Sequence, residues 1–472
     1  MTGQSLWTAQ DMAAACGGVW DGEPKDALTG FTLDSRAVGR GDVFVALKSN
    51  RDGHDFVGAA FVAGAAAALV SRGYARNPGD GALLRVDDTQ SGLERIGRAA
   101  RNRLSPSAYV VAVTGSVGKT GTKEMLRLAF SAFGATHAPE KSFNNHWGVP
   151  LTLARMPADT RYGVFEIGMN HPGEITPLSR MVRPDVAIVT TVAPVHLGQF
   201  SSVEEIAEAK AEIFDGFGGE GTAVLNRDNA HFDLLARRAR ERGAAVLTFG
   251  QHEDADCRLV SADADAAGTT AQIICLGNDY RFRLNVPGAH LVMNALAVLL
   301  AVQATGCDVT RAADALEAFS VPEGRGVVER VTMVDGEVIV IDESYNANPA
   351  SMSAALSVLG LPRAGVVRRV AVLGDMLELG ETGPALHAAL SEDIERAGID
   401  CVFACGPLMA KLYDALPEPR RGGYAQDSND LTPMVLNAVN AGDAVMVKGS
   451  LGSRMGPLLA ALKSHLIKNQ AV

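Results

Sequence analysis

An excess of positive charge, paired cysteines and long hydrophobic runs are all missing from this sequence. Its 43 lysines and arginines stand against 54 aspartates and glutamates, which gives a net charge of −11. The chain as a whole therefore creates no field that would attract a nucleic-acid backbone, and we expect no nucleic-acid partner. A polyanionic substrate would have to be held by local cations.

The other absences indicate a cytoplasmic protein. The six cysteines are scattered and form no C-x-x-C pair of the kind used for zinc or redox chemistry, so we expect reduced thiols in the core. The first residues lack the basic and apolar segments of a secretory signal. The apolar stretches 57–70 and 291–302 are shorter than the roughly 20 residues of a membrane-spanning helix. Both are predicted to be buried helices, and we expect no insertion into a membrane.

What the sequence does contain suits a large α/β protein. It has 472 residues, too many for one ordinary core, with 47% hydrophobic residues, 50 glycines and 6% aromatic residues. The pattern of strand-like and helix-like runs changes after Pro106 and again around Pro322. We predict a mixed α/β domain over residues 1–106, a central P-loop domain over 107–322 and a C-terminal Rossmann-like domain over 323–472.

A glycine-rich turn between an apolar strand and a helix marks the central domain. The strand-like residues 109–113 are followed by Thr-Gly-Ser-Val-Gly-Lys-Thr at 114–120. Backbone N–H groups and the helix dipole at such a turn hold phosphate oxygens, Lys119 reaches the terminal phosphates, and the Thr120 hydroxyl binds Mg²⁺. The alternative is a glycine turn that contains Gly-Lys-Thr by chance. The residues predicted to bind nucleotide here are Gly115, Ser116, Gly118, Lys119, Thr120 and Gly121.

An acidic residue interrupts a second apolar strand. Glu166 lies within a run at 163–167, where a carboxylate is costly unless a cation or hydrogen bonds compensate it. We expect it to bind Mg²⁺ beside Thr120, with His196, which follows the strand-like run 186–191, as a further ligand. Each has a structural alternative, because buried acids are usually paired with a cation and a lone histidine is more often structural.

Lys210 occupies an unusual place on a predicted helix. Ser202 and Glu205 form the pattern of a capping box, and apolar residues follow on one face at helical spacing. Position 210 belongs to the same stripe as Val203, Ile206, Ile213 and Phe217. A lysine on a core face must extend its amine to solvent, find a partner or be chemically modified, and the first outcome is the usual one.

With these residues together, the chain resembles the Mur ligases over essentially its whole length. The blocks that carry the resemblance are residues 114–125, 143–152, 166–175 and 196–210, followed in the third domain by 342–352 and 373–380. The third-domain blocks are similar to those of the branch that joins D-alanyl-D-alanine to UDP-N-acetylmuramoyl-tripeptide. The P-loop alone would indicate no more than a nucleotide site.

The resemblance implies a set of site residues. Ser35 and Arg36 of the first domain would bind the UDP end of the substrate, and Asn294, Arg325 and Asp342 would contact the nucleotide. Substrate contacts are also implied for Asn144, Asn145, Asn346 and Asn348, although the last two are equally good turn formers beside Pro349. In this family the lysine at the position of Lys210 is N-carboxylated, and the residue thereby becomes an anion that supports the magnesium site.

The implied reaction uses ATP and Mg²⁺ to convert the tripeptide carboxylate into an acyl phosphate, which the amine of D-alanyl-D-alanine attacks. The expected catalytic residues are Lys119, Glu166, His196 and Lys210. We expect a monomer that serves peptidoglycan precursor synthesis. Two alternatives remain: a related ligase or folylpolyglutamate synthase that uses a single amino acid, and a P-loop regulatory switch. Against the switch, no N-K-x-D tetrapeptide is present.

Overall fold

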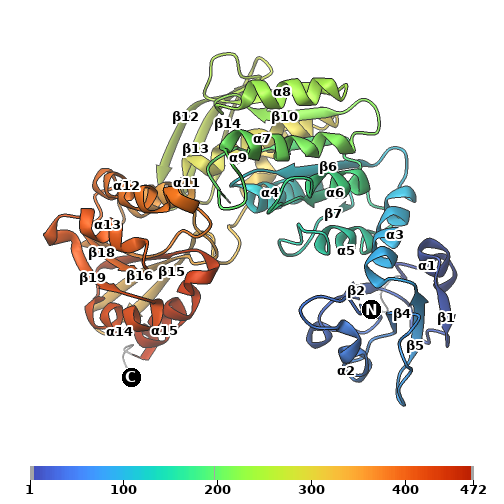
Figure 1. Ribbon diagram of the computed structural model, residues 1–472. Coiled ribbons are helices and arrows are strands. Elements are labelled where there is room, and N and C mark those ends of the chain that lie inside the picture. Colours follow the sequence, from blue (N-terminus) through green and yellow to red (C-terminus); the bar gives the residue numbers. More distant parts are fainter. Residues whose placement is uncertain (1–4, 196, 469–472) are drawn as a thin grey trace.

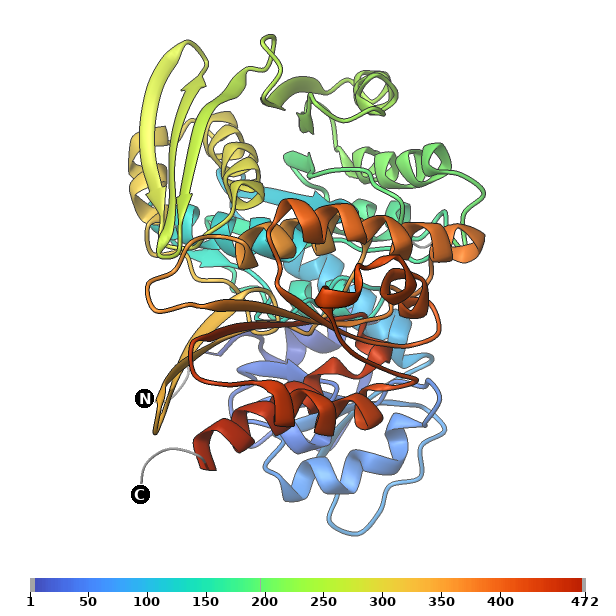
Figure 2. The same ribbon diagram turned by 90° about the vertical axis from the view of Figure 1, so that its left-hand side faces the viewer.

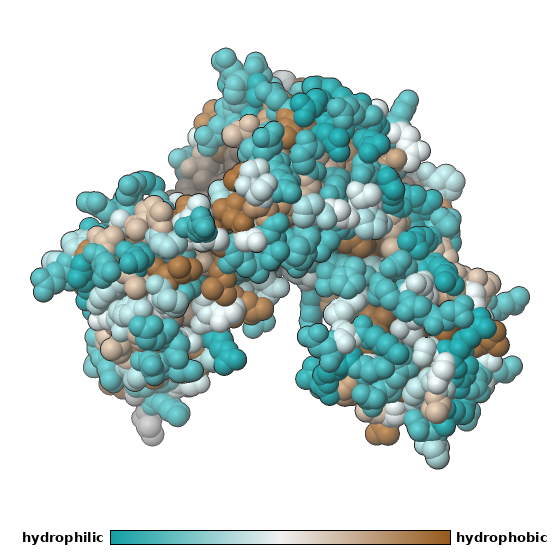
Figure 3. Space-filling view, viewed as in Figure 1, coloured by the Kyte–Doolittle hydropathy of each residue, from teal (hydrophilic) through white to brown (hydrophobic). Residues whose placement is uncertain are grey.

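The computed structural model describes residues 5–195 and 197–468 and is an α/β protein of three lobes (Figure 1). The central lobe forms the top of an arch, and the N- and C-terminal lobes form its two feet. A space-filling view shows the hollow that separates the feet (Figure 3). Each lobe contains one β-sheet, so the predicted α/β class with three units is confirmed. Within the described ranges, no helix is long and apolar enough to cross a membrane.

The N-terminal lobe has a five-stranded sheet in the order β1-β5-β4-β3-β2, in which only β1 is antiparallel to its neighbour. Its strands are β1 (Val19–Asp21), β2 (Gly30–Thr32), β3 (Asp42–Val45), β4 (Ala67–Ser71) and β5 (Ala82–Val86). Its helices are α1 (Ala9–Cys16), α2 (Val57–Val62) and α3 (Thr89–Asn102), with short 3₁₀ turns η1 (Ser35–Ala37) and η2 (Gly53–Phe56).

The prediction of one buried helix over 57–70 is wrong. The stretch divides into α2 and β4, with a turn at Gly64, whose φ of +106° suits glycine and ends the helix. The run of alanines that follows is buried as a strand, and a short apolar run has the same composition in either state.

The central lobe is built on a nine-stranded sheet in the order β14-β13-β12-β11-β10-β9-β6-β8-β7. The strands are β6 (Tyr109–Thr114), β7 (Thr136–His137), β8 (Tyr162–Glu166), β9 (Val186–Val189), β10 (Thr222–Asn226), β11 (Ala245–Gly250), β12 (Cys257–Asp265), β13 (Gly268–Cys275) and β14 (Asn278–Leu284). The helices are α4 (Lys119–Ser131), α5 (Gly148–Ala154), α6 (Ile175–Val182), α7 (Val203–Ala211), continued by η3 (Glu212–Gly216), α8 (Phe232–Glu241), α9 (Ala289–Ala304) and α10 (Val309–Leu316).

Strand β6 lies between β8 and β9 and is parallel to both. In this register Val113 is opposite Glu166, and Thr114 is opposite Val189. The loops that leave the three strands therefore start at one edge of the sheet. Ligands of open α/β sheets bind at this edge, outside the carboxyl ends of the strands.

The C-terminal lobe has a six-stranded sheet in the order β15-β16-β20-β17-β18-β19, parallel except for β15. Its strands are β15 (Val327–Met333), β16 (Gly336–Glu343), β17 (Arg368–Gly374), β18 (Cys401–Cys405), β19 (Arg421–Ala425) and β20 (Asp443–Lys448). Its helices are α11 (Pro349–Leu359), α12 (Gly383–Arg396), α13 (Met409–Ala415), α14 (Ser428–Ala438) and α15 (Met455–Lys468), with 3₁₀ turns η4 (Gly380–Thr382), η5 (Glu418–Arg420) and η6 (Leu451–Ser453). Figure 2 shows these helices on both faces of the sheet.

The N-terminal lobe is joined to the central lobe by a continuous core. Leu151 and Ala154 of α5 are buried in the same cluster as Trp7 and Phe31. The Trp7 indole donates a hydrogen bond to Ala154 O at 2.9 Å. The boundary predicted at residue 106 falls in the connection between α3 and β6, and the one at 322 falls between α10 and β15.

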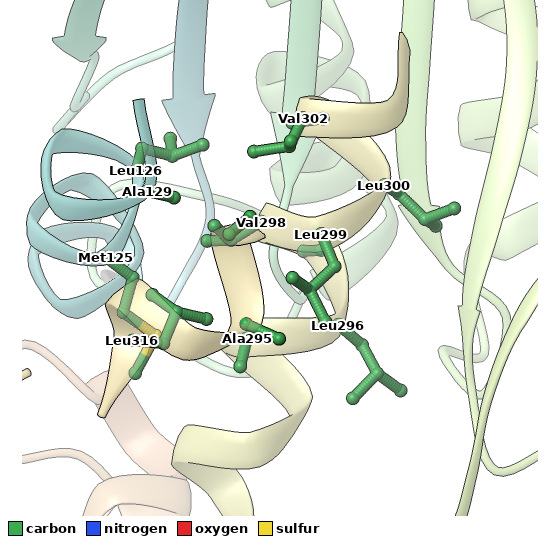
Figure 4. Close-up of a cluster of buried hydrophobic side chains, with 14 of the residues drawn as sticks. Met125, Leu126, Ala129, Ala295, Leu296, Val298, Leu299, Leu300, Val302 and Leu316 are labelled. Atoms are coloured by element: carbon green, nitrogen blue, oxygen red, sulfur yellow. The ribbon is translucent and has the colours of Figure 1, made fainter. Parts of the chain in front are cut away.

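Helix α9 anchors the central lobe, and the helix predicted over 291–302 is confirmed. Its side chains from Ala295 to Val302 are fully buried. Figure 4 shows Ala295 and Val298 on the side of α4, while Leu296 and Leu300 point away from α4. This packing fixes α4, and with it the loop that precedes α4.

We expect Leu299→Ala to lower the free energy of unfolding by about 2–5 kcal/mol, because it removes a fully buried side chain from a close-packed core. Urea unfolding followed by circular dichroism would measure the change. Val367, which is 86% exposed, provides the control: alanine there should change stability by less than about 0.5 kcal/mol. Equal effects at the two positions would contradict this account of the core.

Candidate active site

The loop between β6 and α4 depends on two glycines. Gly115 has φ +151° and Gly118 has φ +88°, both in the region that favours glycine. A Cβ at Gly115 would overlap the Thr190 hydroxyl, and one at Gly118 would lie 2.7 Å from Asn294 Oδ1. The loop is thus held tightly against β9 and α9, with the first N–H groups of α4 at its end. This is the strand-loop-helix geometry of a phosphate-binding site.

Lys119, the first residue of α4, is half-buried rather than open to solvent. Its Nζ donates a hydrogen bond to Gly115 O at 2.6 Å. Burial lowers the pKa of Lys119, the charge of Glu166 opposes this effect, and the charge of Arg325 adds to it. Among the residues that the structure describes, no carboxylate forms an ion pair with Lys119, so its ammonium is available to an anionic ligand.

Glu166, at the end of β8, is 1% exposed and faces the loop. Its Oε2 accepts a hydrogen bond from the Thr120 hydroxyl at 3.0 Å, and its Oε1 accepts one from the Asn144 amide at 2.6 Å. The Thr120 hydroxyl also lies 3.1 Å from Ser142 Oγ. No described lysine or arginine pairs directly with this buried carboxylate. A carboxylate and a hydroxyl side by side are oxygen donors of the type that Mg²⁺ prefers, so the residues present fit that ion.

His196, the third predicted metal ligand, lies outside the described residues. In the ranges 5–195 and 197–468, no group of three or more histidine, cysteine, aspartate or glutamate side chains is arranged to hold a metal. Among the described residues, the donor set is therefore the Thr120 hydroxyl and the Glu166 carboxylate.

Lys210 is buried on α7, with its side chain 2% exposed, as the helical spacing predicts. Burial is the largest cause that lowers its pKa well below the usual value, and the nearby charge of Lys119 adds to it. None of the described residues forms a hydrogen bond or an ion pair with its amine. The amine does not extend to solvent, so the usual outcome for a lysine on a core face is excluded here.

The helix that carries Lys210 differs in detail from the prediction. Ser202 caps α7 by accepting a hydrogen bond from Glu205 N at 3.1 Å, but Glu205 Oε2 accepts from Ser201 N instead of completing a capping box. The α-helix ends at Ala211 and continues as η3 to Gly216. The apolar stripe nevertheless stays buried at Ile206 and Ile213.

A cavity of about 450 Å³ lies between the central and C-terminal lobes, with the loop on one wall. The predicted site residues that line it are Ser116, Gly118, Lys119, Thr120, Gly121, Asn144, Asn145, Glu166, Asn294, Arg325, Asn346 and Asn348. Arg325 is thus brought to the phosphate loop from across the lobe boundary, and its guanidinium stacks on Tyr345 at 4.3 Å. Gly115, Lys210 and Asp342 do not line the cavity.

Several predicted contact residues have structural partners of their own. Asp342 is buried, and its Oδ1 accepts hydrogen bonds from Ser344 N and the Ser344 hydroxyl at 3.0 and 2.7 Å. Asn348 forms the capping box of α11 with Ser351. Asn145 Oδ1 accepts a hydrogen bond from Gly148 N at 2.9 Å, at the start of α5. Asn348 therefore has a structural role as the cap of α11, and it also lines the cavity.

Ser35 and Arg36 lie in the N-terminal lobe, away from this cavity. The Arg36 guanidinium donates hydrogen bonds to both oxygens of Asp34, at 2.9 and 2.8 Å. These bonds lower the pKa of that carboxyl to about 2. The side chain of Arg36 is 88% exposed.

The residues on the cavity wall that were not predicted from the sequence include His290 on α9, Glu343 and Lys448. Glu343 and Lys448 are the last residues of β16 and β20, and Lys448 Nζ donates a hydrogen bond to Glu343 Oε2 at 2.9 Å. The only signal in the sequence is a charged residue at the end of an apolar run, which is weak by itself.

The fold and the loop together define an α/β protein with a phosphate-binding domain and a following Rossmann-like domain. Residues 113–302 match the Mur ligase middle domain, and residues 328–451 match the Mur ligase glutamate ligase domain. The chain belongs to the Mur ligase family.

Within that family, its relatives include UDP-N-acetylmuramoyl-tripeptide--D-alanyl-D-alanine ligases. The Bacillus subtilis enzyme of that name is 33% identical over 92% of this chain and 93% of its own length. The crystal structure of MurF from Acinetobacter baumannii superposes with a TM-score of 0.83 at 28% identity, over 98% of this chain and all of that one. MurF from Thermotoga maritima, solved in complex with ADP, gives a TM-score of 0.75 at 27% identity, over 94% and 99% of the two chains.

We expect Lys119→Ala to leave the protein folded and to reduce turnover by about 10²–10³-fold, because a charge directed at developing phosphate charge is lost. The folded state loses a single hydrogen bond to Gly115 O, about 1 kcal/mol. Steady-state kinetics and thermal unfolding of the same sample would measure both. Turnover near that of the wild type would remove the phosphate-loop assignment.

Proposed function

We propose that this protein is an ATP-dependent ligase that joins D-alanyl-D-alanine to UDP-N-acetylmuramoyl-tripeptide in the cytoplasmic synthesis of peptidoglycan precursor. The observation that carries the proposal is the cavity between the lobes, where the phosphate loop faces Arg325, Asn346 and Asn348. Relatives that match over nine-tenths of both chains have this activity in their names.

The nucleotide site is assigned to the loop. Backbone N–H groups from Gly115 to Gly121 hold the phosphates of ATP, and Lys119 contacts the terminal phosphates. Asn294 lies against Gly118, and Arg325 approaches from the third lobe, so both are placed to contact the nucleotide. The complex of the Thermotoga maritima relative with ADP supports the use of an adenine nucleotide. Asp342 does not line the cavity, and its Oδ1 accepts hydrogen bonds from Ser344, so the contact that we propose with the nucleotide would use its other oxygen.

Thr120 and Glu166 would hold Mg²⁺, with His196 as a further ligand. Bound there, the ion would offset the negative charge that gathers as the tripeptide carboxylate approaches the triphosphate. Lys210 is the group that we propose to be N-carboxylated. Its amine has a lowered pKa and no ion pair among the described residues, so it is suited to take up carbon dioxide and release a proton.

The remaining residues act by holding substrates. Ser35 and Arg36 are assigned to the UDP end, and Asn144, Asn145, Asn346 and Asn348 to the peptide parts. The tripeptide carboxylate attacks the γ-phosphate beside Lys119, which stabilises the charge of the transferred group, and ADP leaves. The amine of the dipeptide then attacks the acyl phosphate, and inorganic phosphate leaves. Closure of the third lobe against the loop would exclude the water that hydrolyses an acyl phosphate.

We expect phosphate release only when ATP, UDP-N-acetylmuramoyl-tripeptide and D-alanyl-D-alanine are all present, because the acyl phosphate needs both organic substrates to turn over. A panel of UDP-muramoyl peptides and amine acceptors, followed by phosphate release and mass spectrometry of the product, would measure this. A preference for a single amino acid would indicate a different ligase. Phosphate release without either organic substrate would indicate a nucleotide switch.

We expect Lys210→Ala to reduce activity by about 10–100-fold or more, because the anion that supports the metal site is lost. Small carboxylic acids at high concentration should restore part of the rate by occupying the vacated space. A ¹³C NMR signal of a carbamate after incubation with ¹³C-labelled bicarbonate, absent from the variant, would identify the modification directly. Alanine at Lys411, exposed on α13, is the matched control and should leave activity unchanged. Full activity of Lys210→Ala would contradict the proposed N-carboxylation of Lys210.

A further inference from the structure

A pair of oppositely charged residues forms part of the third-lobe wall of the cavity, and the reaction described above gives it no part. Glu343 ends β16 and Lys448 ends β20, and the two are register partners in the parallel sheet. Lys448 Nζ donates hydrogen bonds to Glu343 Oε2 at 2.9 Å and to Asn346 O at 3.0 Å. Both residues line the cavity that also contains the phosphate loop.

The burial of this pair is hard to explain by stability alone. The side chain of Lys448 is 2% exposed and that of Glu343 is 18% exposed. The desolvation of two buried charges offsets much or all of their mutual attraction, so apolar residues of similar size would serve the sheet at least as well. The pair lies at the carboxyl end of a parallel sheet, where ligands of such folds bind. A role in ligand binding would explain why these two charges are buried despite the desolvation free energy.

Glu343 lines the cavity, and one of its two oxygens accepts no hydrogen bond from the described residues. Lys448 occupies Oε2, while Oε1 faces the turn at Gly326, where an added Cβ would lie 3.2 Å away. Among the described residues, none donates a hydrogen bond to Oε1. Gly326 follows Arg325, whose charge acts on Lys119, and the charge of Glu343 itself acts on His290 of α9. Glu343 is therefore close to the seam between the two lobes.

The other two carboxylates on the cavity wall, Glu166 and Glu174, have hydrogen-bond partners on both oxygens. Glu166 accepts hydrogen bonds on both oxygens, from Thr120 and Asn144. Glu174 accepts one from Asn170 N at 2.7 Å and pairs with His171 at 2.9 Å. Of the described glutamates and aspartates that line the cavity, Glu343 has the oxygen that is free to bind a cationic group.

We propose that Glu343 Oε1 binds the amino group of the incoming D-alanyl-D-alanine and takes up the proton that this nitrogen loses, with Lys448 as the positioning residue. The inference rests on the ligase function proposed above and adds a residue to it. The nitrogen forms a bond to the acyl carbon. The bond between this carbon and the phosphate oxygen breaks, and the electron pair of that bond leaves with inorganic phosphate. The nitrogen's proton passes to Glu343 and then to solvent.

A carboxylate can accept the proton in this step. An amine nitrogen becomes much more acidic once it has bonded to the acyl carbon, so the proton moves downhill to the carboxylate. Before that point, the same carboxylate attracts the ammonium form of the dipeptide, which releases a first proton to solvent to give the free amine that attacks. Lys448 holds Oε2 by a hydrogen bond that fixes the orientation of Oε1.

Hydroxylamine provides the test, because it is uncharged at neutral pH and attacks acyl phosphates without help from a base. With full-length enzyme, ATP and UDP-N-acetylmuramoyl-tripeptide, we would compare dipeptide ligation with hydroxamate formation. Glu343→Gln should lower the dipeptide rate by about 10²–10⁴-fold while hydroxamate formation stays within about threefold of the wild type. Glu323→Gln, an exposed glutamate near the same lobe boundary, is the matched control and should change neither rate.

The outcomes separate this inference from the proposed function. If the wild type forms neither product, the ligase function fails. If the wild type forms both, and Glu343→Gln lowers both rates equally or neither, the assignment of Glu343 is overturned. Should the glutamine variant fail to fold, Glu343→Asp keeps the charge on a shorter chain. It should lower the dipeptide rate selectively, and an unselective loss would contradict the assignment.

Lys448→Met tests the positioning role with the same two nucleophiles. The long apolar side chain fills the buried space of the lysine stem, and Glu343 loses the bond that orients it. We expect a selective fall in the dipeptide rate and a higher KM for the dipeptide, with hydroxamate formation retained. A variant whose two rates fall together would show that Lys448 serves the sheet and not the nucleophile.

Discussion

A buried carboxylate at the end of a central strand is the constraint on which the rest of the site depends. Glu166 lies opposite Val113 in the sheet, so its side chain is placed next to the turn that follows β6. It is stable there only because Thr120 and Asn144, from two separate segments, donate hydrogen bonds to it. The loop, the helix α4 and the segment before α5 are thereby tied to one point.

Charge near that point is unbalanced in a way that suits an anionic ligand. Lys119 and Lys210 are both buried enough for the pKa of each to be lowered, and the charge of Lys119 contributes to the shift at Lys210. Glu166 alone supplies a negative charge among these three. Phosphate groups would restore the balance at Lys119, and conversion of the Lys210 amine to an anion would remove the repulsion between the two lysines.

The sequence pattern predicted those parts of the site that are formed by residues close together in the chain. The phosphate loop, the buried acid in β8 and the core-facing lysine of α7 each follow from spacing within a few residues. The division of 57–70 into α2 and β4 could not be predicted, because alanine-rich apolar runs suit either element. The Glu343–Lys448 pair was also missed, since it is created by the register of strands 105 residues apart. Asp342 was predicted to contact ligand, and in this structure its Oδ1 accepts hydrogen bonds from Ser344, two residues further along the chain.

The shared core between the N-terminal and central lobes has a consequence for substrate length. Trp7 and Phe31 pack in one cluster with Leu151 and Ala154, and the Arg155 guanidinium donates to Phe31 O, so the first lobe is fixed to the second. The distance from the first lobe to the phosphate loop is therefore set by packed side chains and not by a flexible linker. A substrate whose one end is bound by the first lobe must therefore have the length that spans this fixed distance. A peptide one residue too short would leave its carboxylate away from the phosphate, however tightly its other end was bound.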